Sequence, residues 1–381
     1  MLKRTALLLA AFAAACGATS SNLSSGSATL AITGATVVHP GLDGGAATES
    51  DRTVLIAGDR IVAVGPSAST PVPPGAQVVD GHGKWVIPGL VDSHVHFFQS
   101  ANPFTRPDVV DFTDTVPYAK EVARNKARLP VTFKVWLASG VTSVVDCGGP
   151  FWNFEVRDKA QHSDAAPRVE IAGPLVSFVD RPQMALDDPP IIKVTTAEEA
   201  LALVAKEIAR KPDFIKVWFI HTKEGDLAKE ESIVRAVAEA THAAHIRLLV
   251  HATELPVAKA ALRAGADVLV HSVFNDPVDD EFIGLLKQRN AILLPTLWVG
   301  HGYVQTLTKK LVLTDYEKRL ADPEILAQMG NVPRIDPRIA SRVISNQMLQ
   351  NLAKLWAAGV TIALGTDAGN IGTFHGPGVS G

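Results

Sequence analysis

The 381-residue sequence has little cysteine and little net charge: it contains two cysteines, Cys16 and Cys147, and its formal charge is -3. No cluster of lysine and arginine alternates with aromatic residues, so the sequence gives no electrostatic case for binding nucleic acid. Hydrophobic residues make up 47% of the chain and charged residues 20%, a composition that argues against wholesale disorder. We therefore expect a globular protein with a large core.

The N-terminal segment 1–16 predicts targeting. A lysine and an arginine precede the apolar stretch TALLLAAFAAA, which is too short to span a bilayer and is typical of a secretory signal. Cys16 follows three alanines and precedes a flexible, Gly/Ser-rich tether over residues 17–28, an arrangement that resembles a bacterial lipoprotein signal. We expect export to the periplasm or cell envelope, with lipidation of Cys16 as the only membrane attachment and plain signal cleavage as the alternative. A lipidated Cys16 would leave Cys147 without a disulfide partner.

Two kinds of segment follow the tether. Residues 29–84 alternate short β-rich runs with glycine and proline turns, which predicts a small antiparallel sheet. Over residues 85–381, apolar runs recur with helix-like stretches between most of them. Buried strands that alternate with amphipathic helices predict an α/β fold with a parallel sheet, and eight repeats predict its closure into a (β/α)8 barrel. The eight runs are WVIPGLVDSHVH, GVTSVVDCGG, RVEIAGP, FIKVWFI, IRLLVHA, ADVLVHS, AILLPTL and VTIALGTDAG.

Two of the intervening stretches show a clear helical period. In TTAEEALALVAKEIARK, Thr195 and Glu198 have the spacing of a capping box. The second stretch is EESIVRAVAEATHAA. The predicted apolar faces are Leu201, Val204 and Ile208 in the first helix and Ile233, Val237 and Ala240 in the second.

His94 and His96 stand one residue apart at the end of the first apolar run. Alternate residues of a strand project to the same side, so the two imidazoles point together while Val95 packs on the opposite face. At the C-terminal mouth of a barrel, such a pair could hold a divalent metal ion. Two hydrogen-bonded polar residues at a strand end are the alternative interpretation.

Three further runs end in potential ligands, which are His251, His271 and Asp367. The run DFIKVWFI contains Lys216, whose ammonium group is costly to bury without a partner. One interpretation is a core salt bridge, for example with Asp213. The other is that Lys216 is an uncharged amine that forms a carbamate with CO2, whose two oxygens bridge a pair of metal ions.

The ordered series HxH, Lys, His, His and Asp on strands one, four, five, six and eight resembles the amidohydrolase superfamily, binuclear type, over residues 29–381. The motifs IKVW and HAT are most similar to prolidase- and imidazolonepropionase-related hydrolases. The resemblance implies a (β/α)8 TIM barrel with a small β-sandwich domain, whose N-terminal part would be residues 29–84. Only fourteen residues follow Asp367, so we expect a fold truncated after the eighth barrel strand, without the last helix and the remaining sandwich strands.

The same resemblance implies two metal ions and their ligands. His94, His96 and Asp367 would bind the more buried ion. Lys216, carboxylated by CO2, would bridge the two ions, and His251 and His271 would bind the more exposed one. Nitrogen and oxygen ligands without cysteine are compatible with zinc and do not exclude manganese, cobalt or iron.

The implied chemistry is hydrolysis by a metal-bridging hydroxide. Asp367 would take the proton from the nucleophile and pass it to the leaving amine, and His251 or His271 would stabilise the tetrahedral intermediate. We expect cleavage of an amide bond in a dipeptide or N-acyl amino acid. A cyclic amidase or lactonase with the same site, and a non-catalytic envelope-anchored binding protein, are the alternatives.

The long segment from Trp298 to Ala340 follows the seventh strand and is expected to cap the mouth of the barrel. It contains His301 and Tyr303, which are candidates for binding a substrate carboxylate or carbonyl, or else are plain polar loop residues. His375, in the sequence FHG after the eighth strand, is a third candidate. The expected partner is a small molecule or dipeptide, and the sequence leaves a homo-oligomer open.

Overall fold

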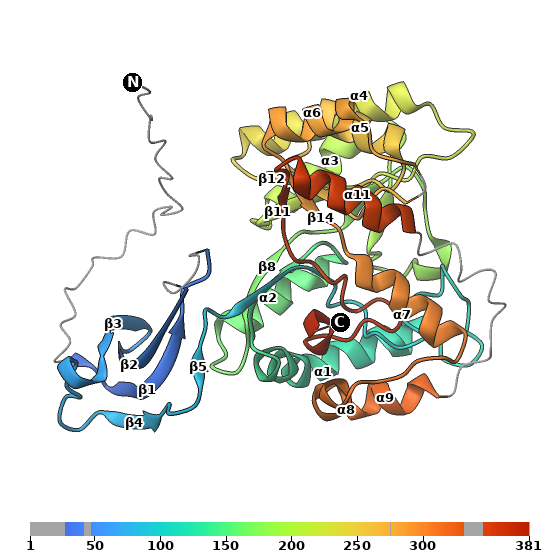
Figure 1. Cartoon of the computed structure of the whole chain (residues 1–381). Coiled ribbons are helices and arrows are strands. Elements are labelled where there is room, and N and C mark those ends of the chain that lie inside the picture. The colour runs from blue at the N-terminus through green and yellow to red at the C-terminus, as the bar shows by residue number, and fades with distance from the viewer. Residues whose placement is uncertain (1–26, 42–46, 275, 331–345, 381) are drawn as a thin grey trace, which may run out of the picture. The chain divides into compact units, whose positions relative to one another are not determined.

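The computed structural model describes residues 27–41, 47–274, 276–330 and 346–380. The chain divides into two compact units, Met1–Pro88 and Gly89–Gly381 (Figure 1). The predicted signal segment with Cys16, and the predicted tether up to residue 26, lie outside the described residues. No helix among the described residues is long and apolar enough to cross a membrane.

The N-terminal unit contains a five-stranded sheet with the order β3-β2-β1-β4, in which β5 also pairs with β1. Its elements are β1 (Leu30–Val38), β2 (Thr48–Ala57), β3 (Arg60–Pro66), the 3-10 turn η3 (Ser67–Ser69), β4 (Gln77–Asp80) and β5 (Trp85–Val86). The pairs β1–β2 and β2–β3 are antiparallel, as predicted, but β4 and β5 run parallel to β1. The prediction of a wholly antiparallel sheet is wrong because residues 67–76 form a crossover long enough to return the chain in the direction of β1.

The strand β5 also corrects the predicted start of the barrel. The sequence pattern assigns Trp85 and Val86 to the first barrel strand, whereas both pair with β1 of the N-terminal sheet. The apolar run is interrupted by Pro88, which has no backbone N–H to donate. At Gly89 a Cβ atom would lie 2.0 Å from Thr142 Oγ1, so the backbone passes too close to its neighbour for any side chain.

Each of the eight predicted apolar runs contains one strand of the second unit. These strands are β6 (Leu90–Val95), β7 (Val141–Asp146), β8 (Arg168–Ile171), β11 (Phe214–Trp218), β12 (Arg247–His251), β13 (Val268–Val270), β14 (Ile292–Leu294) and β15 (Thr361–Ile362). Two short strands, β9 (Leu175–Ser177) and β10 (Ile191–Lys193), extend the sheet beside β11.

All neighbouring pairs among the eight strands are parallel, and two contacts join the separate sheets into a ring. A parallel bridge between Ala172 and Phe214 links β8 to β11. A second bridge, between Val95 and Ala368, links β6 to the segment after β15, and the backbone N–H of Asp367 donates to the carbonyl of His94 at 2.7 Å. The ring therefore closes where the end of β6, with the paired histidines, meets the segment after β15 that contains Asp367.

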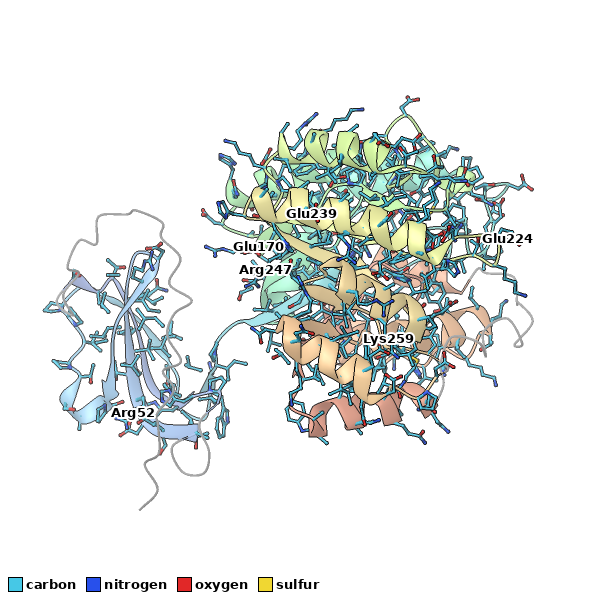
Figure 2. The ribbon with its side chains drawn as sticks, turned by 90° about the horizontal axis from the view of Figure 1, so that it is seen from above. Arg52, Glu170, Glu224, Glu239, Arg247 and Lys259 are labelled. Carbon is cyan, nitrogen blue, oxygen red and sulfur yellow. The ribbon has the colours of Figure 1, made fainter. Side chains whose placement is uncertain are left out.

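Helices follow the strands, as expected for alternating β and α segments. They are α1 (Tyr118–Ala138), α2 (Phe154–Gln161), α3 (Ala197–Ile208), α4 (Leu227–Ala243), α5 (Leu255–Ala264), α6 (Asp280–Arg289), α7 (Leu297–Leu307), α8 (Asp315–Leu320), α9 (Pro323–Met329) and α11 (Asn346–Ala357). Short 3-10 turns are η4 (Phe151–Asn153), η5 (Pro182–Met184) and η6 (Pro377–Ser380). Glu239 on α4 and Lys259 on α5 lie in this outer layer (Figure 2).

The helix α3 begins one residue later than the sequence pattern predicts. Its N-cap is Thr196, whose side chain accepts from the backbone N–H of Glu199, so the predicted Thr195–Glu198 box is wrong. Of the predicted apolar face, Val204 is buried and Ile208 packs against the same core, whereas Leu201 is 37% exposed and Leu203 is buried instead.

The helix α4 agrees with its prediction. Ile233 and Val237 are buried, and Ala240 is partly buried against the same core cluster. Inside the ring, a smaller apolar cluster includes Cys147, Leu249 and Leu294. Leu249 lies two residues before His251 on β12, so the two side chains point to the same side of the strand. This cluster therefore forms the floor beneath the predicted ligands.

Candidate metal centre and substrate cavity

The structure brings His94 and His96 together at the end of β6. Their Nε2 atoms lie 3.2 Å apart, while Val95 between them is fully buried in another core cluster. His96 Nδ1 lies 2.7 Å from the carbonyl oxygen of Gly148. A carbonyl only accepts, so Nδ1 carries the proton and Nε2 keeps a free lone pair for a metal ion.

Asp367 completes a three-residue cluster with these histidines. Its Oδ1 lies 3.2 Å from His96 Nε2 and 3.5 Å from His94 Nε2. One ligand atom from each residue lies within 4.8 Å of the others, and all three residues are buried. Burial alone would raise the pKa of Asp367, but the neighbouring His96 and, to a smaller extent, the Arg106 guanidinium outweigh it and lower that pKa to about 2. The carboxylate is therefore ionised at neutral pH.

A buried carboxylate holds the two ligand-bearing strands together. Asp92 Oδ1 accepts from the backbone N–H of His94 at 3.3 Å and of Thr366 at 3.0 Å, and Thr366 Oγ1 donates to Asp92 Oδ2 at 2.5 Å. Burial raises the pKa of Asp92 to about 7, against the opposing hydrogen bonds from Thr366. Asp92 thus fixes the register of β6 against the segment that leads to Asp367.

Three residues at strand ends in this region have left-handed backbones, with φ of 75° at His271, 45° at Thr296 and 64° at Asp367. Such conformations cost of order 1–3 kcal/mol each in non-glycine residues and persist where the surroundings enforce them. Their gathering at one mouth of the ring is typical of a functional site.

Lys216 is buried inside the ring, and its side chain is 1% exposed. Its Nζ has no hydrogen-bond partner among the described residues. Asp213 instead accepts from Arg157 at 3.1 Å and from the backbone N–H of Ile171 at 2.9 Å, so the predicted alternative of a Lys216–Asp213 salt bridge is not formed. Burial lowers the pKa of Lys216 below 10.5, which favours the neutral amine.

His251 and His271 lie beside Lys216 and the first two histidines. The ring centroids of His251 and His271 are 4.4 Å apart, and those of His94 and His271 are 5.1 Å apart. His271 Nδ1 lies 2.5 Å from Thr296 Oγ1, so Nε2 of the same ring is available to other partners. Burial lowers the pKa of His94, His251 and His271 well below 6.5, so these imidazoles are neutral, as metal coordination requires.

These donors fit a pair of divalent ions. All six predicted ligands line one cavity of about 170 Å³. Two buried nitrogens, Lys216 Nζ and His94 Nδ1, have no hydrogen-bond partner among the described residues. Imidazole and carboxylate donors without sulfur suit zinc and do not exclude manganese, cobalt or iron. The ligand atoms of His94, His96 and Asp367 form a close cluster, and His251 and His271 lie in the lining of the same cavity outside that cluster.

The same cavity contains polar groups that the sequence analysis missed. Arg106, from the loop after β6, and Asn370, from the loop after β15, both line it, as does the predicted Tyr303 of α7. The remaining wall is largely apolar and consists of Phe98, Leu175, Met184, Ile191, Trp218, Phe274 and Val299, with Gln99 among the polar residues.

Arg106 is held by a bidentate pair with Asp108, at 2.7 Å from Nε and 2.8 Å from Nη2. Burial would lower the pKa of Arg106, but Asp108 outweighs burial and raises it, so the guanidinium is charged. A second guanidinium, that of Arg181, lies 3.4 Å from Asp108 and 4.8 Å from the Trp218 ring centroid. Two cations thus surround one carboxylate, so the group of Arg106, Asp108 and Arg181 has one net positive charge.

Two of the three predicted substrate residues lie away from this cavity. His301 stacks on Trp298, with ring centroids 4.6 Å apart, and lines a different pocket. His375 Nε2 lies 3.0 Å from the backbone carbonyl of His96, and its ring faces a neighbouring cavity. The expected capping segment contains the helices α7, α8 and α9, and residues 331–345 lie outside the described residues. Of that segment, Val299 and Tyr303 reach the cavity.

Comparisons with known proteins match this architecture. An imidazolonepropionase of Rubrobacter xylanophilus is 47% identical over 51 residues, which is 12% of each chain. An uncharacterized protein of Mycobacterium tuberculosis strain H37Rv is 24% identical over 220 residues, or 56% of this chain and 51% of that protein. The chain thus matches about half or less of the length of these relatives.

Solved structures resemble the chain over most of its length. A Xaa-Pro dipeptidase with bound methionine in its active site has a TM-score of 0.65 at 24% identity, covering 92% of this chain and 81% of that one. A putative prolidase from Bifidobacterium longum has a TM-score of 0.61 at 24% identity, with coverages of 89% and 74%. The ochratoxinase of A. niger has a TM-score of 0.63 at 19% identity, with coverages of 89% and 75%. These likenesses concern the fold.

The sequence model of the amidohydrolase family matches residues 85–376, which contain the ring of strands and every residue of the cluster described above. The chain therefore belongs to the amidohydrolase family.

Proposed function

We propose that this protein is a metal-dependent hydrolase that cleaves an amide bond of a dipeptide or N-acyl amino acid. The observation that carries the proposal is the convergence of six donor side chains, one of them an unpaired buried lysine, on one cavity that also contains a charged guanidinium. The prolidase and dipeptidase structures of the same fold are consistent with this substrate class.

We assign the more buried ion to His94, His96 and Asp367, and the more exposed ion to His251 and His271, with Lys216 between them. Bound there, two divalent ions would polarise a carbonyl group and lower the pKa of a water molecule toward neutrality.

Lys216 would contribute as a carbamate. Its neutral amine can form an N–C bond with CO2 and release one proton, which gives a carbamate whose two oxygens share one negative charge. The carbamate replaces a buried amine that has no hydrogen-bond partner among the described residues, and its oxygens are acceptor atoms that cations can bind.

Asp367 is the proposed proton carrier. Its carboxylate is ionised at neutral pH and lies at the mouth of the ring, so it can take a proton from the attacking water and deliver it to the leaving amine. His251 and His271 are neutral and line the same cavity, where they would stabilise negative charge on the tetrahedral intermediate through the ion that they hold.

Arg106 is the proposed binding group for the substrate carboxylate. A guanidinium has five N–H donors, and the bonds to Asp108 and Asn370 use three of them. The remaining donors and the local excess of positive charge favour an anionic group. The apolar wall opposite, which includes Phe98, Leu175 and Met184, fits an uncharged side chain or acyl group.

The test is a screen of dipeptides and N-acyl amino acids with the full-length, metal-loaded protein. We expect hydrolysis of substrates with a free carboxylate and much weaker turnover of the same compounds as carboxamides. A protein that binds two metal ions and hydrolyses no member of the library would contradict the proposal and favour the alternative of a non-catalytic binding protein.

Hydrolysis of a cyclic amide is the second candidate. It is favoured by the 47% identity to an imidazolonepropionase over 51 residues, although that match covers a small part of both chains. A cyclic substrate changes the leaving group and not the ligands, so cyclic amides and lactones belong in the same screen. Turnover of a ring without turnover of its open-chain counterpart would decide for this candidate.

We also propose export to the periplasm or cell envelope with a lipid on Cys16. The proposal rests on the N-terminal sequence.

A further inference from the structure

Asn370 joins three side chains around the proposed site. Its side-chain Nδ2 donates to Asp367 Oδ1 at 2.6 Å. Its Oδ1 accepts from Arg106 Nη1 at 2.7 Å and from the Tyr303 hydroxyl at 2.8 Å. Asn370 itself is 2% exposed, and it lines the cavity together with the three residues that it contacts.

The chemistry of these partners fixes the orientation of the amide. The guanidinium of Arg106 has only donors, so the atom facing it must be the amide oxygen, and the carboxylate of Asp367 has only acceptors, so the atom facing it must be the amide nitrogen. The hydroxyl proton of Tyr303 is therefore directed to Asn370, and burial raises the pKa of this hydroxyl, which keeps it protonated. A reversed amide would place its NH2 group against the Arg106 donors and its oxygen against the Asp367 carboxylate.

The partners of Asn370 are themselves fixed. Arg106 is held by the bidentate pair with Asp108, and Tyr303 lies in α7 with 9% exposure. Asp367, in contrast, has a left-handed backbone with φ of 64° and needs external support to keep one conformation. Asn370 thus transmits the placement of two rigid groups to a carboxylate whose backbone is strained.

We propose that Asn370 is a positioning residue that orients the Asp367 carboxylate toward the paired histidines and links it to Tyr303 and Arg106. The expected effect of Asn370 on turnover rests on the proposed function, whereas its expected effect on metal binding rests only on the proposed metal ligands. Tyr303 then acts mainly through Asn370, because its hydroxyl proton is already used in that bond.

The test compares Asn370→Ala with Asn351→Ala. Asn351 is a matched control, because it is also a buried asparagine, 3% exposed, with its side chain bonded to Val278, Val273 and Asp276 away from the cavity. Metal affinity is measured by competition with a chelator, without substrate. Loss of a residue that supports a metal ligand lowers affinity by about 10–100-fold, and we expect a loss of that size for Asn370→Ala and wild-type affinity for Asn351→Ala.

In the steady state, we expect Asn370→Ala to lower kcat more than it raises KM, because the proton carrier is displaced while the apolar wall is intact. Equal metal affinity in Asn370→Ala and wild type would overturn the inference, as would equal losses in both asparagine variants. If the wild type binds two ions and hydrolyses nothing, the proposed function fails while the affinity comparison still decides the role of Asn370.

Tyr303→Phe provides a second test that retains the ring and the fold. We expect it to weaken metal binding several-fold in the wild-type background and to have no further effect in the Asn370→Ala background. Equal effects in the two backgrounds would show that Tyr303 acts independently, and would refute the link through Asn370. Should Asn370→Ala not fold, an unchanged metal affinity in Tyr303→Phe would by itself count against the inference.

Discussion

Substitution of Lys216 by methionine should stabilise the metal-free protein while removing its ability to hold two metal ions. Lys216 is 1% exposed, and its Nζ has no hydrogen-bond partner among the described residues. A buried polar group without a partner costs about 1–3 kcal/mol, and an apolar side chain of similar length removes that cost. We expect the free energy of unfolding of metal-free Lys216→Met to exceed that of the wild type by about 1–3 kcal/mol.

The difference in unfolding free energy between Lys216→Met and the wild type should depend on pH. Burial lowers the pKa of Lys216 in the folded protein below its unfolded value of 10.5. Between these two values the unfolded chain binds more protons than the folded one, so the stability of the wild type rises with pH in that window. The advantage of Lys216→Met should therefore be largest below the folded pKa and should shrink as pH approaches 10.5.

The assay is urea unfolding of chelator-treated protein at several pH values, with metal analysis of the same preparations after reloading. Lys206→Met is the control, because Lys206 is exposed on α3 and such surface substitutions change stability by less than about 0.5 kcal/mol. A metal-free Lys216→Met that is less stable than the wild type, or a variant that retains both ions after reloading, would refute the reasoning about this lysine.

Three further predictions follow from individual contacts. Thr366→Val removes the 2.5 Å hydrogen bond to Asp92 and should lower the free energy of unfolding by about 1.5–3 kcal/mol, measured by urea denaturation at pH 8. Thr366→Ser keeps the hydroxyl and should retain most of the stability. An equal loss in both variants would contradict this role of the hydroxyl. Arg106→Met should lower kcat/KM about 10–100-fold more for substrates with a free carboxylate than for their carboxamide analogues, so equal losses in both classes would argue against carboxylate binding. Cys16→Ser should shift the full-length protein, expressed in a bacterium, from the membrane fraction to the soluble envelope fraction; unchanged membrane association would exclude a lipid on Cys16.

The ring of strands could be predicted because each strand is a separate apolar run, and each run ends at the mouth of the ring. His251, His271 and Asp367 follow such runs, so their positions in the sequence nearly determine their positions in space. The limits of the first strand could not be predicted in this way. Trp85 and Val86 are apolar like the residues of β6, and only their pairing with β1 assigns them to the other unit.

The substrate side of the cavity depends on contacts that leave no local pattern. Arg106 and Asn370 meet across 264 positions of the chain, and neither follows an apolar run. Asn370, three residues after Asp367, carried a signal that could have been used, since asparagine in a glycine-rich turn commonly bonds back to nearby groups.

Helix geometry explains why Tyr303 lines the cavity and His301 does not. They were predicted as loop residues, but both lie in α7. Residues two apart on a helix point about 200° away from each other, so only one of them can face the cavity. The segment would have had to be identified as a helix before this choice could be made.

The most direct test of the account is the metal content of the wild-type protein purified with added divalent metal, measured by mass spectrometry of the elements beside a His94→Ala, Asp367→Ala double variant. Six side chains that hold a pair of cations predict about two ions per chain in the wild type and a clear deficit in the double variant. A wild-type protein that retains no ion, or a double variant that retains the same number as the wild type, would contradict the account.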